Sequence, residues 1–573
     1  MKRALAFLIT LCLLLAAAAF IPAVAEGGSA EAVADAAKKA PSPSDGMPLK
    51  VALLVVFFGI MIGIGLYCRR HATDVNGFVL GGRSVGPWLT AFAYGTSYFS
   101  AVIFVGYAGQ FGWRFGIAST WIGLGNAVIG SLLAWVVLGR RTRIMTQHLG
   151  SATMPDFFEK RFGSSSLKII ASVIIFIFLI PYTASLYNGL SRLFEMAFGI
   201  PYIWCVLVMS VLTGIYVIAG GYMATAINDF IQGLIMIVGI VAVIVSVLGQ
   251  HGGLMGSMAE LALEQDTAIA NGQVPGIFAS FFGPDPMFLL GVVVLTSLGT
   301  WGLPQMVGKF YAIKSEGDIH KGTIISTAFA IVIAGGCYFL GGFGRLSDGI
   351  RVFEQSGPPA GGYDAIIPAM LENLGPLLIG VVMILVLSAS MSTLSSLVLT
   401  SSSTVTLDLL KDRVIKQMGE KKQLLIMRAL IVVFIAVSAG IAIVQVNSPV
   451  AFIAQAMGVS WGAMAGAFLA PFLYGLYWKG ATKASCVVSF FFSSVFMTLV
   501  MLINLGVIPT NFLGVLNNPI YAGAFCMLIG LVIIPVISLL SPKPDRALVA
   551  NAFSCYEKKV TVRQTEALGD EQA

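Results

Sequence analysis

The sequence predicts an all-α membrane protein with about thirteen transmembrane helices, because apolar runs of about 20 residues recur along the whole chain. Each run is long enough to cross a hydrocarbon core of roughly 30 Å. Of the 573 residues, 57% are hydrophobic and 11% are charged, whereas a soluble domain carries about 25% charged residues. This composition excludes a soluble enzyme. The net charge of +7 lies in short basic clusters between apolar runs, which argues against binding to nucleic acid.

The N-terminus has the features of a secretory signal peptide. A basic start at Lys2-Arg3 is followed by an apolar stretch that ends in Ala23-Val24-Ala25. We therefore expect a signal peptide over 1–25, with an uncleaved first membrane helix as the alternative. The next segment, 26–48, is rich in Ala, Ser, Pro and charged residues, and is expected to be disordered and extracytoplasmic.

The apolar runs divide the domain at 49–541 into thirteen expected spans. They are 49–68, 86–110, 118–139, 169–195, 202–219, 225–249, 287–308, 322–344, 374–410, 427–444, 449–474, 485–505 and 518–540. With residue 48 outside, the loops expected in the cytoplasm hold most of the 34 Lys and Arg, while the outer loop 250–286 has none. The positive-inside rule thus predicts a multi-pass protein of the inner (plasma) membrane, with its N-terminus outside and its tail, 542–573, in the cytoplasm.

Two of the expected spans are interrupted by small or helix-breaking residues. The interruptions lie at 93–100 and at 296–304, and each opens a run of five spans. Irregular backbone inside a membrane is tolerated only where it is buried in protein or lines a cavity. Two five-helix repeats, at about 86–249 and 287–474, are therefore expected to form the inverted-repeat core of a secondary transporter.

The span 374–410 is rich in hydroxyl groups. Ser392, Ser395 and Ser396 are spaced i, i+3 and i+4, so they share one face of a helix, and Thr393 points about 100° away. Hydroxyl and carbonyl oxygens are ligands that hard cations prefer. The alternative is that these hydroxyls mediate helix packing. The interruption near 95–99 favours cation binding, because unwound backbone supplies free carbonyl groups.

Asp229 is a second candidate, at the start of the span 225–249. A charge at mid-helix costs about 2.5–3.5 kcal/mol, so an intramembrane carboxylate is a functional candidate by default. It could equally be an interfacial residue stabilised by the helix N-terminus, and the sequence leaves both readings open. The four histidines fall in loops and the seven cysteines have no paired spacing. No catalytic residues, metal cluster or enzymatic activity are expected.

Three ordered motifs resemble the sodium:solute symporter family, in particular sodium:proline and sodium:pantothenate symporters. They lie at 78–87, at 216–229, which includes a Gly-Gly pair and Asp229, and at 391–396. The resemblance runs from about Asp74 to Arg428 and more weakly to about residue 540.

The resemblance implies a five-plus-five inverted-repeat core of the leucine-transporter type with flanking helices. It also implies a sodium site made of the carbonyl oxygens of Thr96, Phe99 and Ala389 and the hydroxyls of Ser392 and Thr393. Some members carry a further sodium site, and its positions here are Asp229, Ser392, Ser395 and Ser396. These two sets lead to the hypothesis that two sodium ions accompany each solute.

The expected solute is a small carboxylate or amino-acid-like molecule of the pantothenate or proline type. Tyr98 stands where the proline type has aspartate, Thr296 and Thr300 replace its aromatic residues, and Gln305 stands where the pantothenate branch has histidine. The candidate residues lining the solute site are Ser97, Tyr98, Ser100, Thr296, Thr300 and Trp301.

The expected function is sodium-coupled import by alternating access. The expected partners are the organic solute, Na⁺ and the lipid bilayer, with no nucleic acid and no obligatory protein partner. The alternatives are a proton-coupled transporter of the same fold and a solute-sensing membrane receptor.

Overall fold

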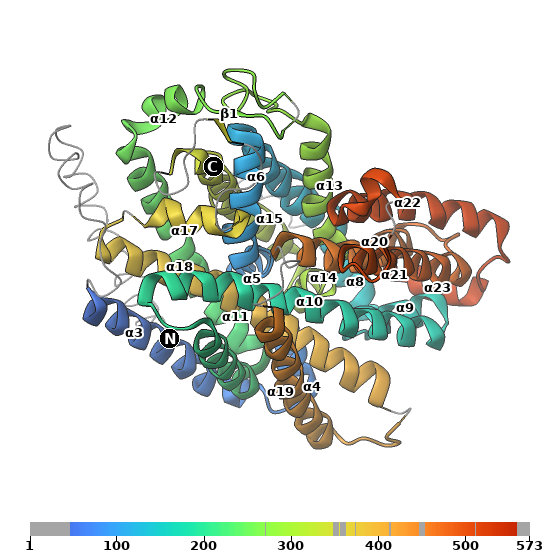
Figure 1. Ribbon diagram of the computed structural model, residues 1–573. Helices are drawn as coiled ribbons and strands as arrows, with labels where there is room; N and C mark the ends of the chain where they lie inside the picture. The colour runs from blue at the N-terminus through green and yellow to red at the C-terminus, as the bar shows by residue number, and fades with distance from the viewer. Residues whose placement is uncertain are drawn as a thin grey trace, which may run out of the picture.

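The computed structural model describes residues 46–557, apart from 270, 348–353, 356–361, 373, 412–413, 446–452 and 510–511. The predicted signal peptide at 1–25 lies outside the described residues, as do most of the predicted outer segment 26–48 and the end of the predicted tail 542–573. Nearly all of the described secondary structure is helical (Figure 1).

The first half of the described chain runs from α3 to α12, with short 3-10 or π-helical segments labelled η. Its elements are α3 Met47–Cys68, η1 Arg69–His71, α4 Val75–Leu80, η2 Gly81–Arg83, α5 Pro87–Tyr98, η3 Val102–Tyr107, α6 Ala108–Phe115, η4 Gly116–Ser119, α7 Thr120–Gly125, η5 Asn126–Leu133, η6 Trp135–Gly139, α8 Arg140–His148, α9 Met154–Phe162, α10 Ser165–Phe198, α11 Tyr202–Gln250 and α12 Gly253–Leu261.

The second half contains the remaining helices and both strands of one small parallel sheet. In this sheet Gln265 pairs with Glu354 and Asp266 pairs with Gln355. Its elements are β1 Gln265–Asp266, α13 Pro286–Gly302, α14 Pro304–Ala312, α15 Glu316–Ala330, η7 Ile331–Gly335, α16 Gly336–Gly341, η8 Gly344–Leu346, β2 Glu354–Gln355, η9 Tyr363–Ala365, α17 Ile366–Leu371, α18 Pro376–Thr404, η10 Val405–Leu410, α19 Glu420–Gln445, α20 Ile453–Tyr477, α21 Lys483–Asn504, η11 Gly514–Asn517, α22 Pro519–Leu540 and α23 Arg546–Ser554.

Within the described residues, ten helical segments are long and apolar enough to cross a membrane, or eleven if the bent pair α13 and α14 forms one span. Each of the thirteen predicted ranges overlaps helical residues. The count is lower than thirteen partly because the continuous segment Tyr202–Gln250 covers two predicted spans. In the same way, Val102–His148 covers one predicted span and part of a second one. The number of crossings and their direction therefore remain predictions.

Both interruptions that the sequence predicts are breaks in a helix. α5 ends at Tyr98, Phe99 is extended (φ −87°, ψ 123°), and a π-helical turn begins at Val102. α13 ends at Gly302, Leu303 is extended (φ −80°, ψ 123°), and α14 leaves at a bend of 45°. Each break leaves backbone groups without partners in the helix, so both must lie inside the protein.

The hydroxyl-rich helix α18 lies near the centre of the molecule, beside α5, α10 and α11 (Figure 1). In the apolar 18-residue stretch of the segment Pro376–Leu410, 78% of the residues are buried. The corresponding value for the peripheral helix α3 is 22%. Hydroxyl groups are poorly satisfied by lipid, whereas a central helix can pair them with neighbouring backbone. The position of α18 follows from its composition.

A third break, at Gly221, joins the predicted spans 202–219 and 225–249 within α11. Its backbone (φ 55°, ψ −150°) lies in a region that only glycine adopts without strain. A Cβ atom at this position would also lie 2.8 Å from the carbonyl oxygen of Phe78. The close approach of 78–87 to the Gly-Gly pair therefore depends on a missing side chain.

We expect Gly221→Ala to destabilise the protein by roughly 1–3 kcal/mol, because the side chain adds both backbone strain and a steric clash. Gly249→Ala, in the same helix, is the matched control, since a Cβ atom there would have no other atom within 4 Å. Thermal unfolding of both purified variants in detergent measures the difference. Equal melting temperatures for the two would contradict this explanation of the glycine.

Candidate functional site

Five oxygen atoms meet where α18 passes the broken end of α5, and we call them the five-oxygen cluster. Ser392 Oγ lies 3.1 Å from the carbonyl oxygen of Thr96 and 3.0 Å from that of Ala389. Thr393 Oγ1 lies 3.2 Å from the carbonyl oxygens of Thr96 and Phe99 and 3.1 Å from that of Ala389. All five residues are buried. The structure thus brings together the complete first set of predicted ligands.

Helix termination explains why the Thr96 carbonyl group is available. The helix α5 stops at Tyr98, so the carbonyl groups of its last turn have no amide donor one turn further along the chain. The Gly95 carbonyl still accepts from the Phe99 amide at 3.2 Å, whereas the Thr96 carbonyl faces the two hydroxyls of α18. The break in α5 and the hydroxyls of α18 therefore form one site.

The two hydroxyl groups of the five-oxygen cluster share the three carbonyl groups around them. Ser392 and Thr393 each carry one hydroxyl proton, but their oxygens make five close contacts with carbonyl oxygens. At most two of those contacts can be hydrogen bonds at one time. The Ala389 carbonyl already accepts an amide within α18, so the two protons suffice for the carbonyls of Thr96 and Phe99. The five oxygens still present unused lone pairs close together. Neutral oxygens in this number suit a hard cation such as Na⁺.

The second predicted set of ligands is arranged differently. Ser395 Oγ donates to the carbonyl oxygen of Ser392 at 2.9 Å. Ser396 Oγ lies 2.8 Å from Ser97 Oγ. Asp229 is fully buried on α11, and neither of its carboxylate oxygens has a hydrogen-bond partner among the described residues. Asp229 and Ser396 of this set have a charged neighbour in common.

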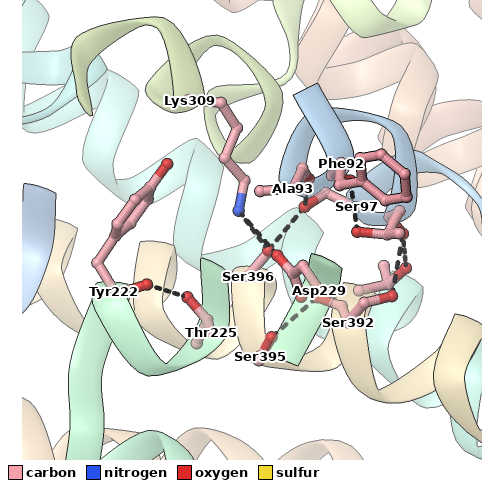
Figure 2. A network of polar contacts seen from close by, with 12 residues as sticks. Phe92, Ala93, Ser97, Tyr222, Thr225, Asp229, Lys309, Ser392, Ser395 and Ser396 are labelled. Carbon is pink, nitrogen blue, oxygen red and sulfur yellow. Dashed lines mark hydrogen bonds and ion pairs between the residues drawn. The ribbon is translucent and has the colours of Figure 1, made fainter. Parts of the chain in front are cut away.

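The shared neighbour is Lys309, which directly follows the predicted span 287–308 and so was expected in a cytoplasmic loop. The structure corrects this: α14 continues to Ala312, and Lys309 is 3% exposed. Its Nζ donates to Ser396 Oγ at 3.0 Å, lies 3.6 Å from Asp229 Oδ2, and lies 5.2 Å from the centre of the Tyr222 ring (Figure 2). The ion pair has no direct hydrogen bond at 3.6 Å.

A sequence signal for Lys309 exists but is weak. Gln305 and Lys309 are spaced i and i+4, so they lie on one face of any helix that continues past the break at Leu303. A lysine at the end of an apolar run is usually a topology signal, which favours a loop position. Sequence reasoning could not show that α14 turns inward toward Asp229.

A cavity of about 50 Å³ adjoins this ion pair. Lys309, Ser396, Tyr222 and Gln305 contribute to its wall, which continues past the C-terminal part of α18 to the loop preceding α9. Neither polar atom of the Gln305 amide has a hydrogen-bond partner among the described residues. The cavity therefore extends from Lys309 to residues 152–154, at the start of α9.

The predicted solute-lining residues divide into two groups. The hydroxyls of Thr296 and Thr300 and the indole of Trp301 bond to backbone carbonyls of Val292, Gly130 and Ile129, respectively. Ser97 bonds to the Ala93 carbonyl and contacts Ser396. Three of these five contacts, to Gly130, Ile129 and Ser396, tie the broken helices to their neighbours, and the other two lie within a single helix.

Tyr98 and Ser100 lie at the break itself and are buried. The Tyr98 hydroxyl has no hydrogen-bond partner among the described residues. The Tyr98 ring lies 6.3 Å from Trp461 on α20, and a Cβ atom at Gly299 would lie 2.6 Å from Trp461. Sequence analysis missed Trp461, because a tryptophan within an apolar span gives no signal that separates a binding site from packing.

Comparison with known proteins agrees with this architecture. Residues 78–492 match the model of the sodium:solute symporter family. Sodium/proline symporter 2 of Staphylococcus saprophyticus is 30% identical over 447 residues, which cover 76% of this chain and 82% of that protein. The osmoregulated proline transporter OpuE of Bacillus subtilis is 30% identical over 430 residues, covering 74% and 83% of the two chains.

A solved structure of a Na⁺-coupled sialic acid symporter in a substrate-bound, outward-open state has a similar fold. Its TM-score is 0.70 at 17% sequence identity, and the match covers 87% of this chain and 98% of that chain. The chain therefore has the leucine-transporter-like fold of a multi-pass membrane transporter. Since the family model covers most of the sequence, the chain belongs to the sodium:solute symporter family.

Proposed function

We propose that this protein imports a small organic solute across the plasma membrane together with sodium, by alternating access. The five-oxygen cluster is the observation that supports sodium binding by this chain. Family membership supports sodium-coupled symport in general, and the cluster supports the particular ligands Thr96, Phe99, Ala389, Ser392 and Thr393. The proposed core consists of two inverted repeats, at about 86–249 and 287–474.

The proposed coupling follows from which elements the ion would join. A sodium ion in the five-oxygen cluster would contact α5 of the first proposed repeat and α18 of the second. Binding would therefore stabilise one arrangement of the repeats, which we infer to be outward-open and competent for solute. Each sodium charge that crosses 100 mV supplies about 2.3 kcal/mol. A tenfold ratio of solute concentrations across the membrane costs about 1.4 kcal/mol, so this energy supports a ratio between about tenfold and a hundredfold.

The second set of predicted ligands, Asp229, Ser392, Ser395 and Ser396, is likewise proposed as a cation position. Its Asp229 and Ser396 already flank the ammonium of Lys309. The identity of its occupant, a sodium ion or this ammonium group, decides how many sodium ions each cycle carries.

For the solute we propose a molecule that bears a carboxylate and a compact apolar part. The proposed binding region is the break after Tyr98, with Ser97, Ser100, Thr296, Thr300 and Trp301 as further candidates. The partnerless Tyr98 hydroxyl offers a hydrogen bond, and the nearby Trp461 ring offers an apolar wall. The relatives transport proline or sialic acid by name, and both of those molecules carry a carboxylate.

We expect Thr393→Ala to raise the sodium concentration for half-saturation by roughly tenfold or more, because it removes the hydroxyl that contacts three carbonyl oxygens. Binding of radioactive sodium to the purified full-length protein measures this without knowledge of the solute. Thr393→Ser keeps the hydroxyl and should change affinity much less.

Ser402→Ala is the matched control for that measurement. It removes a hydroxyl that is also buried on α18 but donates only to the Leu399 carbonyl at 3.2 Å. We expect its sodium affinity to equal that of the natural protein. If Thr393→Ala and Ser402→Ala bound sodium equally well, the proposed site would be wrong.

A competition panel in proteoliposomes tests the solute class. With an inward sodium gradient, we expect uptake of a carboxylate among L-proline, pantothenate and sialic acid, and none of neutral sugars. Uptake that needs an imposed pH gradient and no sodium would instead support the proton-coupled alternative. Binding without uptake would support the receptor alternative.

Once a solute is found, Tyr98→Phe tests the proposed hydroxyl contact. We expect its KM for that solute to rise about tenfold, because a buried hydrogen bond is lost, while sodium affinity without solute stays unchanged. Tyr521→Phe on the peripheral helix α22 is the control, since its ring packs against Phe288 at 5.0 Å. An unchanged KM in Tyr98→Phe would exclude this contact.

A further inference from the structure

We propose that the ammonium group of Lys309 takes the place of a second sodium ion. Each transport cycle then carries one sodium ion, and neutralising Lys309 opens a second sodium site. This inference rests on the proposed sodium-coupled function. It concerns the group formed by Asp229, Ser396 and Lys309, which we call the lysine site (Figure 2).

The charge balance of the lysine site is already complete. Asp229 and Lys309 are both buried, with side-chain exposures of 0% and 4%, and Nζ lies 3.6 Å from Oδ2. A buried carboxylate needs one positive charge nearby, and Lys309 supplies it. A sodium ion bound to Asp229 and Ser396 as well would place two cations beside one carboxylate in a medium of low dielectric constant.

The hydrogen bonds around Ser396 also leave its hydroxyl oxygen free to accept a hydrogen bond from Lys309. Ser97 Oγ donates its single proton to the Ala93 carbonyl at 2.6 Å, so in its 2.8 Å contact with Ser396 it must accept. Ser396 therefore donates to Ser97 and accepts from the ammonium at 3.0 Å. This chain of bonds links Lys309 on α14 to the broken helix α5, as a bound ion would link them.

The other two predicted ligands of the second sodium face elsewhere. Ser392 Oγ belongs to the five-oxygen cluster, and Ser395 Oγ donates to the backbone carbonyl of Ser392. The two cation positions therefore lie close together on α18 without sharing an occupant. The face of the Tyr222 ring, 5.2 Å from Nζ, provides a further favourable contact for the ammonium.

Removing the ammonium would leave a site that a small cation can reach. The cavity of about 50 Å³ touches Lys309, Ser396 and the partnerless amide of Gln305. Lys309→Gln would leave the carboxylate of Asp229 without a positive partner, and sodium could then enter from this cavity. The neutral variant should gain a sodium site where the natural protein has none.

The test is to count bound sodium ions with radioactive sodium on the purified full-length protein. We expect one ion in the natural protein, two in Lys309→Gln, and one in Lys309→Arg, which keeps the positive charge. The double variant Asp229→Asn/Lys309→Gln removes both charges and should return to one. Two ions in the natural protein, or one ion in a folded Lys309→Gln, would overturn the inference.

A second measurement covers the case in which Lys309→Gln is folded but too unstable for the counting experiment. Since sodium would replace the missing charge, its melting temperature should rise in NaCl and should not rise in choline chloride, and the increase should exceed that of the natural protein. Equal stability in both salts would contradict the inference. A natural protein that binds no sodium would contradict the proposed function itself, whereas one that binds two would contradict only the role of Lys309.

Discussion

Carbonyl groups that lose their amide donors inside a membrane are the constraint on which this structure depends. The helix α5 ends at Tyr98 in the interior, where the carbonyl groups of its last turn cannot form hydrogen bonds with water. The hydroxyls of Ser392 and Thr393 supply hydrogen bonds to the carbonyls of Thr96 and Phe99 in place of the missing amides. Five oxygen atoms are thereby gathered in one buried place, an arrangement that suits the proposed cation.

The buried charges follow a related rule. A single carboxylate in the interior is expensive, and Asp229 is tolerated because the ammonium of Lys309 lies near it. That pair connects α11 to α14, and Ser396 extends the connection to α18 and Ser97 on α5. Both broken helices are thus joined to α18 through polar groups. Movement of α5 or α14 against α18 would have to change these contacts.

Glycine determines how closely the helices can approach these polar groups. Gly221 permits a backbone conformation that other residues avoid and lets Phe78 lie against α11. Gly299 leaves room for the Trp461 ring beside the break after Tyr98. In both places an absent side chain lets an aromatic residue approach a helix closely. Such close packing also compensates for the weak hydrophobic driving force between helices within a bilayer.

The sequence by itself determined the helical membrane class and the places of both helix breaks, because hydropathy and helix-breaking residues are local properties. The first set of predicted cation ligands was implied by the resemblance to the symporter family, and the structure brings the oxygen atoms of that set together. Tertiary structure alone decided which distant groups meet. Lys309 looked like a loop residue because its charge is a topology signal in isolation, and only the inward course of α14 brings it to Asp229. Trp461 was missed for the same reason, since burial beside Tyr98 depends on how α20 packs and not on the residues around it in the chain.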